Sequence, residues 1–319
     1  MPNPSEPKPE RIAKVLARAG LCSRRDAERW VAEGRVKVNG KILTTPAVTV
    51  IPSDTVQVDG KPLPQAQAPR LWRYHKPPGL VTSHRDPEGR PTVFERLDKR
   101  LPRVVSVGRL DLTSEGLLLL TNDGGLARRM ELPSTGWLRR YRVRVHGTVS
   151  ADKLASLKDG ITISGIQYGP IKAALDSQRG ANAWLTVSLT EGKNREIRKV
   201  MEHLGLTVTR LIRTTYGPFQ LGHLEKGQIA EVPPRTMLEQ LGTSPSGDGI
   251  VSKDKLAKTG WAKPKEKKNA RPRTKSDGKN KSDKSSSLEK PFAGKPYRKK
   301  RQSKPKLKSA SSRPKDRRT

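Results

Sequence analysis

The chain has 319 residues and a formal net charge of +34, with 65 lysine and arginine residues against 31 acidic ones. This charge favours a polyanionic partner, above all a nucleic acid, over an acidic protein or a neutral metabolite. No apolar run approaches the roughly 18 residues that cross a bilayer, and a single cysteine, Cys22, excludes an internal disulfide, so we expect a cytoplasmic protein with no membrane partner.

Two short helices are predicted near the N-terminus. Within residues 11–19, apolar side chains recur at spacings of three, four and seven, which is the period of a helix. Ser23, with Asp26 three residues later, has the pattern of a capping box that opens a second helix. Arg24 and Arg25 are expected on the polar face of that second helix.

Short strands are predicted after these helices. Residues 36–38 and 55–58 alternate between apolar and polar side chains. The pairs Asn39-Gly40 and Asp59-Gly60 are typical of tight hairpin turns. Helices and strands together predict one compact unit over residues 8–62.

This unit resembles the S4 RNA-binding module. The resemblance is carried by residues 21–25, Leu-Cys-Ser-Arg-Arg, and by residues 34–40, Gly-Arg-Val-Lys-Val-Asn-Gly. It implies that Arg24, Arg25 and Lys37 bind RNA, and it does not identify a reaction. We refer to residues 8–62 as the S4-like unit.

A second domain is predicted over residues 71–242, after a linker at 63–70 that is rich in proline, glutamine and alanine. Alternation predicts strands at 141–145, 184–189 and 208–212, and helical periodicity predicts helices at 150–157 and 194–204. Four consecutive leucines at 117–120 indicate a strand buried on both faces, near the centre of a sheet. The predicted fold class is therefore α+β, with a mixed and mainly antiparallel sheet.

The last segment, residues 243–319, is predicted to be a disordered basic tail. It contains 26 lysine and arginine residues against 7 acidic ones, with few apolar side chains to offset the entropy of ordering. Such a tail suits nonspecific binding to phosphates, and a solubility role is the alternative.

Several kinds of chemistry are not indicated by the sequence. The five histidines lie far apart, with no pair at the spacing of metal ligands. No phosphate-binding loop and no strand-linked Gly-x-Gly-x-x-Gly motif is present. We therefore expect neither a metal nor a small-molecule cofactor.

One carboxylate stands out, that of Asp111 in the run Gly-Arg-Leu-Asp at 108–111. The run lies between the apolar residues 104–107 and the four leucines. From the pattern alone, Asp111 also fits an aspartate that caps a turn.

Residues 108–111 and 113–124 resemble the central motif of the RsuA and RluB branch of the pseudouridine synthases. Three further stretches, at 75–79, 140–143 and 191–199, also resemble motifs of that family and lie along the chain in the order in which the family has them. The resemblance covers about residues 10–242. It implies that a uridine in ribosomal RNA is converted to its C-glycoside isomer, the base being detached at N1 and rejoined through C5.

The resemblance also implies a catalytic set of Asp111, Tyr141 and Arg198. Asp111 matches the essential aspartate of the family, acting as a nucleophile or a general base. Arg198 is expected to be its ion-pair partner, and Tyr141 to stack on a uridine flipped out of its helix. Ile197 is expected to form a wall of the base pocket.

Further residues of these motifs are expected to contact RNA, namely Lys76, Arg109, Lys193, Asn194 and Arg195. Within the family, the motifs and the basic tail are most similar to the type that acts on 23S rRNA, and we expect a monomer. Two alternatives are a synthase that acts on 16S rRNA and a noncatalytic S4-type RNA-binding factor for ribosome assembly.

Overall fold

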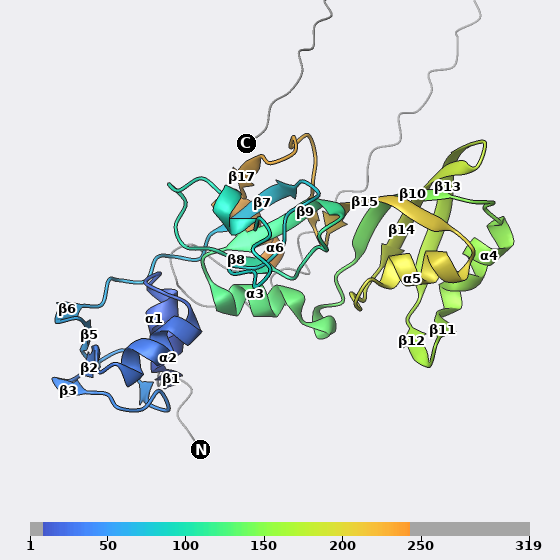
Figure 1. Ribbon diagram of the computed structural model, residues 1–319. Helices are drawn as coiled ribbons and strands as arrows, with labels where there is room; N and C mark the ends of the chain where they lie inside the picture. Colours follow the sequence, from blue (N-terminus) through green and yellow to red (C-terminus); the bar gives the residue numbers. More distant parts are fainter. Residues whose placement is uncertain (1–8, 243–319) are drawn as a thin grey trace, which may run out of the picture. The chain divides into compact units, whose positions relative to one another are not determined.

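The computed structural model of the protein describes residues 9–242 (Figure 1). The predicted basic tail at 243–319 lies outside the described residues. Within the described range, no helix is both long enough and apolar enough to span a bilayer.

The N-terminal elements form a small unit with a core of its own. They are β1 (Glu10–Arg11), α1 (Ile12–Arg18), α2 (Arg24–Ala32), β2 (Val36–Val38), β3 (Lys41–Ile42), β4 (Thr49–Val50), β5 (Val56–Val58) and β6 (Lys61–Pro62). Ile12, Leu16 and Val31 are fully buried in that core. The predicted helices and strands are confirmed.

The predicted capping box is confirmed at the start of α2. The Ser23 hydroxyl accepts a hydrogen bond from the Asp26 N–H at 3.0 Å, and the Asp26 carboxylate accepts one from the Ser23 N–H at 3.3 Å. Two backbone donors that the helix itself cannot satisfy are paired in this way. The helix therefore begins where the sequence predicts it.

Residues 63–70 contain neither helix nor strand, and the larger part of the fold begins at Leu71. Its elements are β7 (Leu71–Lys76), β8 (Val105–Val107), β9 (Ser114–Thr121), α3 (Gly124–Glu131), β10 (Arg139–His146), α4 (Ala151–Ser156), β11 (Ile161–Ile163), β12 (Ile166–Tyr168), β13 (Ile171–Arg179), β14 (Asn182–Leu189), α5 (Glu196–His203), β15 (Thr207–Tyr216), β16 (Phe219–Gln220), β17 (Ile229–Glu231) and α6 (Pro234–Leu241). Three short 3-10 turns lie at Phe94–Arg96, Pro133–Thr135 and Leu157–Asp159. The domain limits at 62, 70 and 242 stay predictions.

One mixed sheet organises this part of the chain, with strand order β13-β14-β10-β15-β9-β7-β17 (Figure 1). Its neighbouring strands pair antiparallel except β15 and β9, which run parallel. Strand β9 lies inside the sheet, and all eight of its residues are buried. The prediction of an inner, doubly buried leucine strand is confirmed, as is the α+β class.

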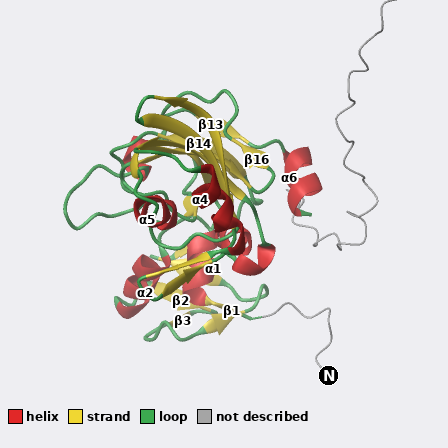
Figure 2. Ribbon diagram, turned by 90° about the vertical axis from the view of Figure 1, so that its right-hand side faces the viewer, coloured by secondary structure: helices red, strands yellow, loops and turns green. Residues whose placement is uncertain are grey.

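The two faces of the sheet are covered by different elements. Tyr141, Val143 and Val145 of β10 share one core with Leu154 of α4 and Met201 of α5, so both helices pack on that face (Figure 2). A second core, built around the opposite face of β9, includes side chains from α3 and α6. No helix of the described chain contributes a buried apolar side chain to the second face of β10, β14 and β13. That half of the sheet has one covered and one open face.

Gly116 lies at a close approach between the two halves of the sheet. It pairs with Arg213 across the parallel junction, and its φ is +103°. A Cβ atom at this position would lie 2.3 Å from the Arg213 carbonyl oxygen, far inside van der Waals contact. Only glycine fits both the conformation and the space.

We therefore expect Gly116→Ala to lower the free energy of unfolding by about 2–5 kcal/mol, from strain at a positive φ and from overpacking. Urea denaturation followed by circular dichroism measures the change. The matched control is Gly124→Ala in α3, where the added Cβ has no backbone neighbour within 4 Å. Equal stability of the two variants would contradict this account of the junction.

Candidate active site

A cavity of about 730 Å³ lies on the face of the sheet that α5 covers. Its walls come from the loop between β8 and β9, from β10 and β15, and from the segment that leads into α5. The volume is within the range of sites that bind small organic groups. Because these segments are far apart in the sequence, only the fold brings them together.

The loop between β8 and β9 places Asp111 in this wall. Gly108 begins the loop with a φ of +65°, and its N–H donates a hydrogen bond to the Glu131 carboxylate at 2.6 Å. The Leu110 carbonyl accepts a hydrogen bond from the Thr82 hydroxyl at 2.9 Å. The Asp111 carboxylate itself is half-buried and has no hydrogen bond or ion pair within residues 9–242.

Lys76 fixes the same loop through its backbone. The side chain is 0% exposed, and its Nζ donates hydrogen bonds to the carbonyls of Asp111 at 3.1 Å, Ser114 at 2.9 Å and Pro77 at 3.1 Å. Burial lowers the pKa of this amine to about 8, a shift that the carboxylates of Asp111 and Glu115 oppose. The prediction that Lys76 contacts RNA is wrong, because its side chain has no exposed surface.

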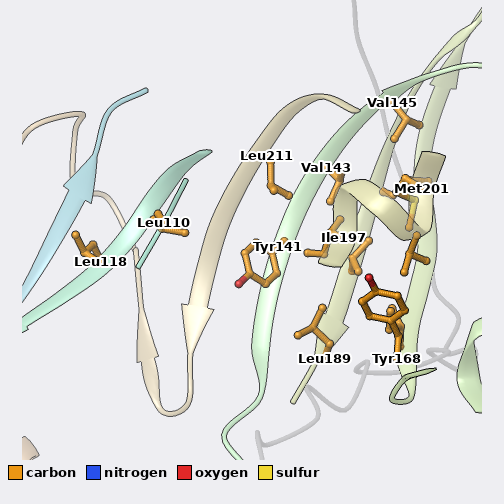
Figure 3. Packing of buried hydrophobic residues seen from close by; sticks show 14 of the residues in the cluster. Leu110, Leu118, Tyr141, Val143, Val145, Tyr168, Leu189, Ile197, Met201 and Leu211 are labelled. Carbon is orange, nitrogen blue, oxygen red and sulfur yellow. The ribbon is translucent and has the colours of Figure 1, made fainter. Parts of the chain in front are cut away.

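Tyr141 and Ile197 supply an aromatic and an aliphatic wall. Tyr141 is 9% exposed on β10, and Ile197 is 5% exposed in the first turn of α5. Figure 3 shows Tyr141 and Val143 on the side of β10 that faces the helix carrying Ile197 and Met201. Both predicted residues therefore line the same cavity as Asp111.

Arg198 lies near Asp111 without pairing with it. Its Nη2 donates to the Thr113 hydroxyl at 2.9 Å, and its Nη1 donates to the Val208 carbonyl at 3.2 Å. Burial lowers the pKa of the guanidinium, Arg195 adds to this effect, and Asp111 opposes it. The predicted ion pair is not formed between these described side chains. Arg198 instead holds Thr113, two residues beyond Asp111.

Arg213 is a cavity residue that the sequence did not reveal. It is 3% exposed, its Nε donates to the Leu117 carbonyl at 2.8 Å, and its guanidinium lies 5.0 Å from the centre of the Tyr216 ring. Its Nη2 is buried and has no partner among the described residues. The predicted strand ended at residue 212, whereas β15 continues to Tyr216. An arginine two residues after the apolar Leu211, on the same strand face, was the available signal.

The other predicted RNA-binding residues divide between the cavity and the S4-like unit. Those at the cavity are exposed: Arg109, Lys193, Asn194 and Arg195. Lys193 also donates to the Glu191 carboxylate at 2.7 Å and to the Gln167 carbonyl at 2.7 Å. In the S4-like unit, Arg24 and Arg25 are exposed on α2, and Lys37 is half-buried on β2. Their contacts with RNA stay predictions.

The arrangement suits the binding of a flat polar ring beside a carboxylate. The cavity combines the aromatic ring of Tyr141, the unpaired carboxylate of Asp111 and the unpaired donor of Arg213. Within the described residues, no three side chains of the metal-binding types come together.

Two family models match the chain. The one described as RNA pseudouridylate synthase matches residues 70–203, and that of the S4 domain matches residues 10–56. Both matches agree with the resemblances that the motifs carry.

Three proteins with similar sequences extend these matches. An uncharacterized RNA pseudouridine synthase of Rickettsia felis is 50% identical over 223 residues, covering 70% of this chain and 96% of that protein. The ribosomal large subunit pseudouridine synthase B of Pseudomonas aeruginosa is 39% identical over 289 residues, covering 86% and 73% of the two chains. The protein of the same name from Salmonella typhimurium is 43% identical over 218 residues, covering 66% and 75%.

A solved structure shares the fold. A crystal structure of a pseudouridylate synthase superposes with a TM-score of 0.52 at 26% sequence identity, and the match covers 72% of this chain and 99% of the other.

The lowered pKa of Lys76 gives a testable dependence of stability on pH. Between pH 8 and the ordinary lysine value of 10.5, the unfolded chain binds more protons at this position than the folded one. The free energy of unfolding of the wild type should therefore rise with pH in this window, relative to that of Lys76→Met.

Urea denaturation of both proteins at several pH values measures this difference. Lys99→Met, which removes an exposed lysine, is the control and should show no such trend against the wild type. If the difference in free energy of unfolding between the wild type and Lys76→Met stays constant or falls as the pH rises, the pKa of the buried amine is not lowered.

Proposed function

The chain belongs to the RNA pseudouridylate synthase family, and we propose that it converts a uridine of large-subunit ribosomal RNA, the 23S rRNA, to pseudouridine. Members of this family are isomerases, and so is this protein. A separate match shows an S4 domain at residues 10–56. The large-subunit target is supported by the relatives named for that activity, at 39% and 43% identity.

The observation that carries the assignment of the site is the unpaired Asp111 carboxylate inside a cavity of suitable size. A carboxylate in a merely structural turn is expected to accept hydrogen bonds from neighbouring backbone groups. Asp111 accepts none from the described residues, although its own backbone is held by Lys76. The loop is thus fixed while the carboxylate stays available to a ligand.

The reaction balances without any added reagent. The bond between C1′ of the ribose and N1 of the base breaks, and a bond between C1′ and C5 forms. The hydrogen lost from C5 is matched by one gained at N1, so there is no net oxidation or reduction.

Asp111 has two possible roles in these steps, as a nucleophile or as a general base. Both need the carboxylate next to the ribose or to the base. A uridine stacked in a helix cannot reach a cavity wall, so the nucleotide has to be flipped out at a cost of a few kcal/mol. Stacking on the Tyr141 ring offsets part of that cost.

Arg198 and Arg213 support this geometry from two sides. Arg198 positions the end of the catalytic loop through Thr113 rather than through the carboxylate. Arg213 has a buried Nη2–H without an acceptor, which is costly unless a ligand oxygen fills the place. A carbonyl oxygen of the pyrimidine is an acceptor of the right kind.

We propose further that the protein acts as a monomer in the cytoplasm. We assign ribosomal RNA as the substrate. The cytoplasm is the compartment in which a single unpaired cysteine, here Cys22, is expected.

The direct test is Asp111→Asn, which keeps the size of the side chain and removes its charge. We expect pseudouridine formation on a 23S rRNA transcript to fall by at least about 100-fold, since carboxylate chemistry is lost. The dissociation constant for RNA should stay within about threefold, because phosphate contacts supply most of the affinity. Carbodiimide mapping and filter binding measure the two quantities.

Asp152→Asn, which changes an exposed aspartate of α4, is the matched control and should modify RNA like the wild type. Modification by Asp111→Asn at the wild-type rate would remove Asp111 from the mechanism. If the wild-type protein modifies a 16S transcript and not the 23S transcript, its target lies in the small-subunit RNA. If it modifies neither RNA, a noncatalytic assembly factor is favoured.

A further inference from the structure

The open face of the sheet carries a row of cations on β10. Arg140, Arg142 and Arg144 are exposed, and they alternate with Tyr141 and Val143, which are buried toward the cavity side. Since successive side chains of a strand point to opposite faces, the three arginines lie on the face away from the cavity. Their spacing along the strand is about 7 Å.

Strand β13 adds two more cations to the same face. Lys172 and Arg140 are both in register with Ser188 of β14, and Arg179 is aligned through Asn182 with His146 at the end of β10. Both cations are exposed. We call these five residues, Arg140, Arg142, Arg144, Lys172 and Arg179, the arginine face.

The arginine face keeps an excess of positive charge within the described chain, where the Asp176 carboxylate lies beside it and accepts a hydrogen bond from the Thr186 hydroxyl at 2.9 Å. None of its five side chains forms an ion pair there, whereas nearby Arg210 and Lys226 both pair with Glu115, at 2.8 and 2.9 Å. Arg144 also stands directly opposite Arg210 across the β10–β15 ladder. Because Glu115 pairs with Arg210 and Lys226 and not with Arg144, Arg144 has no carboxylate partner in this pairing.

One aromatic side chain organises part of this surface. The guanidinium of Arg142 lies 4.5 Å from the centre of the Trp184 ring, over its face. Trp184 is half-buried on β14 and belongs to neither of the cores of this domain. The stacking orders the arginine and leaves its N–H groups free to meet an acceptor.

The chemistry of the arginine face selects one kind of partner. A protein interface needs an apolar centre. The side chains in register with the three arginines of β10 are mostly polar, Thr186, Ser188, Arg210 and Thr215, and the two apolar ones, Trp184 and Ile212, are half-buried. The basic segment at 243–319 carries the same sign of charge. A regular array of phosphates satisfies unpaired guanidinium groups without any apolar contact.

We propose that the arginine face binds the phosphate backbone of a second segment of the ribosomal RNA, while the cavity on the opposite face of the sheet holds the target uridine. The identity of this RNA as the enzyme's own substrate rests on the proposed function. The protein then holds two strands or helices of one RNA across the thickness of a single sheet.

The test compares the full chain with Arg140→Gln/Arg142→Gln/Arg144→Gln. Binding to a 23S rRNA transcript is measured over a range of KCl concentrations. Loss of three phosphate contacts should reduce the slope of log K against log salt by about 2–3 and weaken binding about 10-fold or more. The rate of pseudouridine formation at saturating enzyme should stay at the wild-type value, because no changed residue lines the cavity.

Two further variants serve as controls. Lys99→Gln/Lys153→Gln/Lys158→Gln removes the same charge from exposed positions elsewhere, and it should alter the slope by less than one. The triple lysine variant Arg140→Lys/Arg142→Lys/Arg144→Lys keeps the charge and should keep the slope. The segment at 243–319 is present in every protein, so its contribution cancels.

An unchanged salt slope in the glutamine variant would overturn the proposal, as would an equal loss in the control at Lys99, Lys153 and Lys158. Failure of the proposed function gives a different result. In that case the wild type forms no pseudouridine, while the comparison of slopes still reports on the arginine face.

Discussion

The buried ammonium group of Lys76 holds the loop that carries Asp111, together with the hydrogen bonds made by Gly108 and Leu110. The loop between β8 and β9 crosses the edge of the cavity without helix or strand partners of its own, so its carbonyls need donors from elsewhere. Lys76 supplies them from the end of β7, at the cost of desolvating its charge. The Lys76 side chain is fully buried, and its hydrogen bond to the Asp111 carbonyl fixes the backbone of Asp111.

The sheet explains how one chain can offer a closed site and an open surface. The parallel pairing of β9 with β15 joins two halves whose covering elements lie on different faces. Gly116 and Arg213 meet at this junction, and Arg213 also reaches the cavity. Beyond the junction, the helices of residues 9–242 cover β10, β14 and β13 on one face alone. The same strand therefore presents Tyr141 to the cavity and arginines to the opposite side.

The sequence predicted those parts of the fold that depend on local patterns. The leucine run, the capping box at Ser23 and the alternation along β10 are decided by neighbouring residues, and the structure agrees with each. Side-chain partners were harder to predict, because they depend on contacts between distant segments. Motif position alone made Lys76 a candidate RNA contact and paired Arg198 with Asp111. The structure buries Lys76 under the loop and directs Arg198 to Thr113. Arg213 was missed because the predicted strand ended at residue 212, although its spacing from Leu211 places it on the buried face of the longer strand β15.

The most direct measurement is a structure of the protein bound to a 23S rRNA fragment that contains the modified position. The account predicts one nucleotide outside its helix and inside the cavity, its base against the Tyr141 ring and its sugar next to the Asp111 carboxylate. A complex in which RNA occupies the S4-like unit and every nucleotide stays outside the cavity would contradict it.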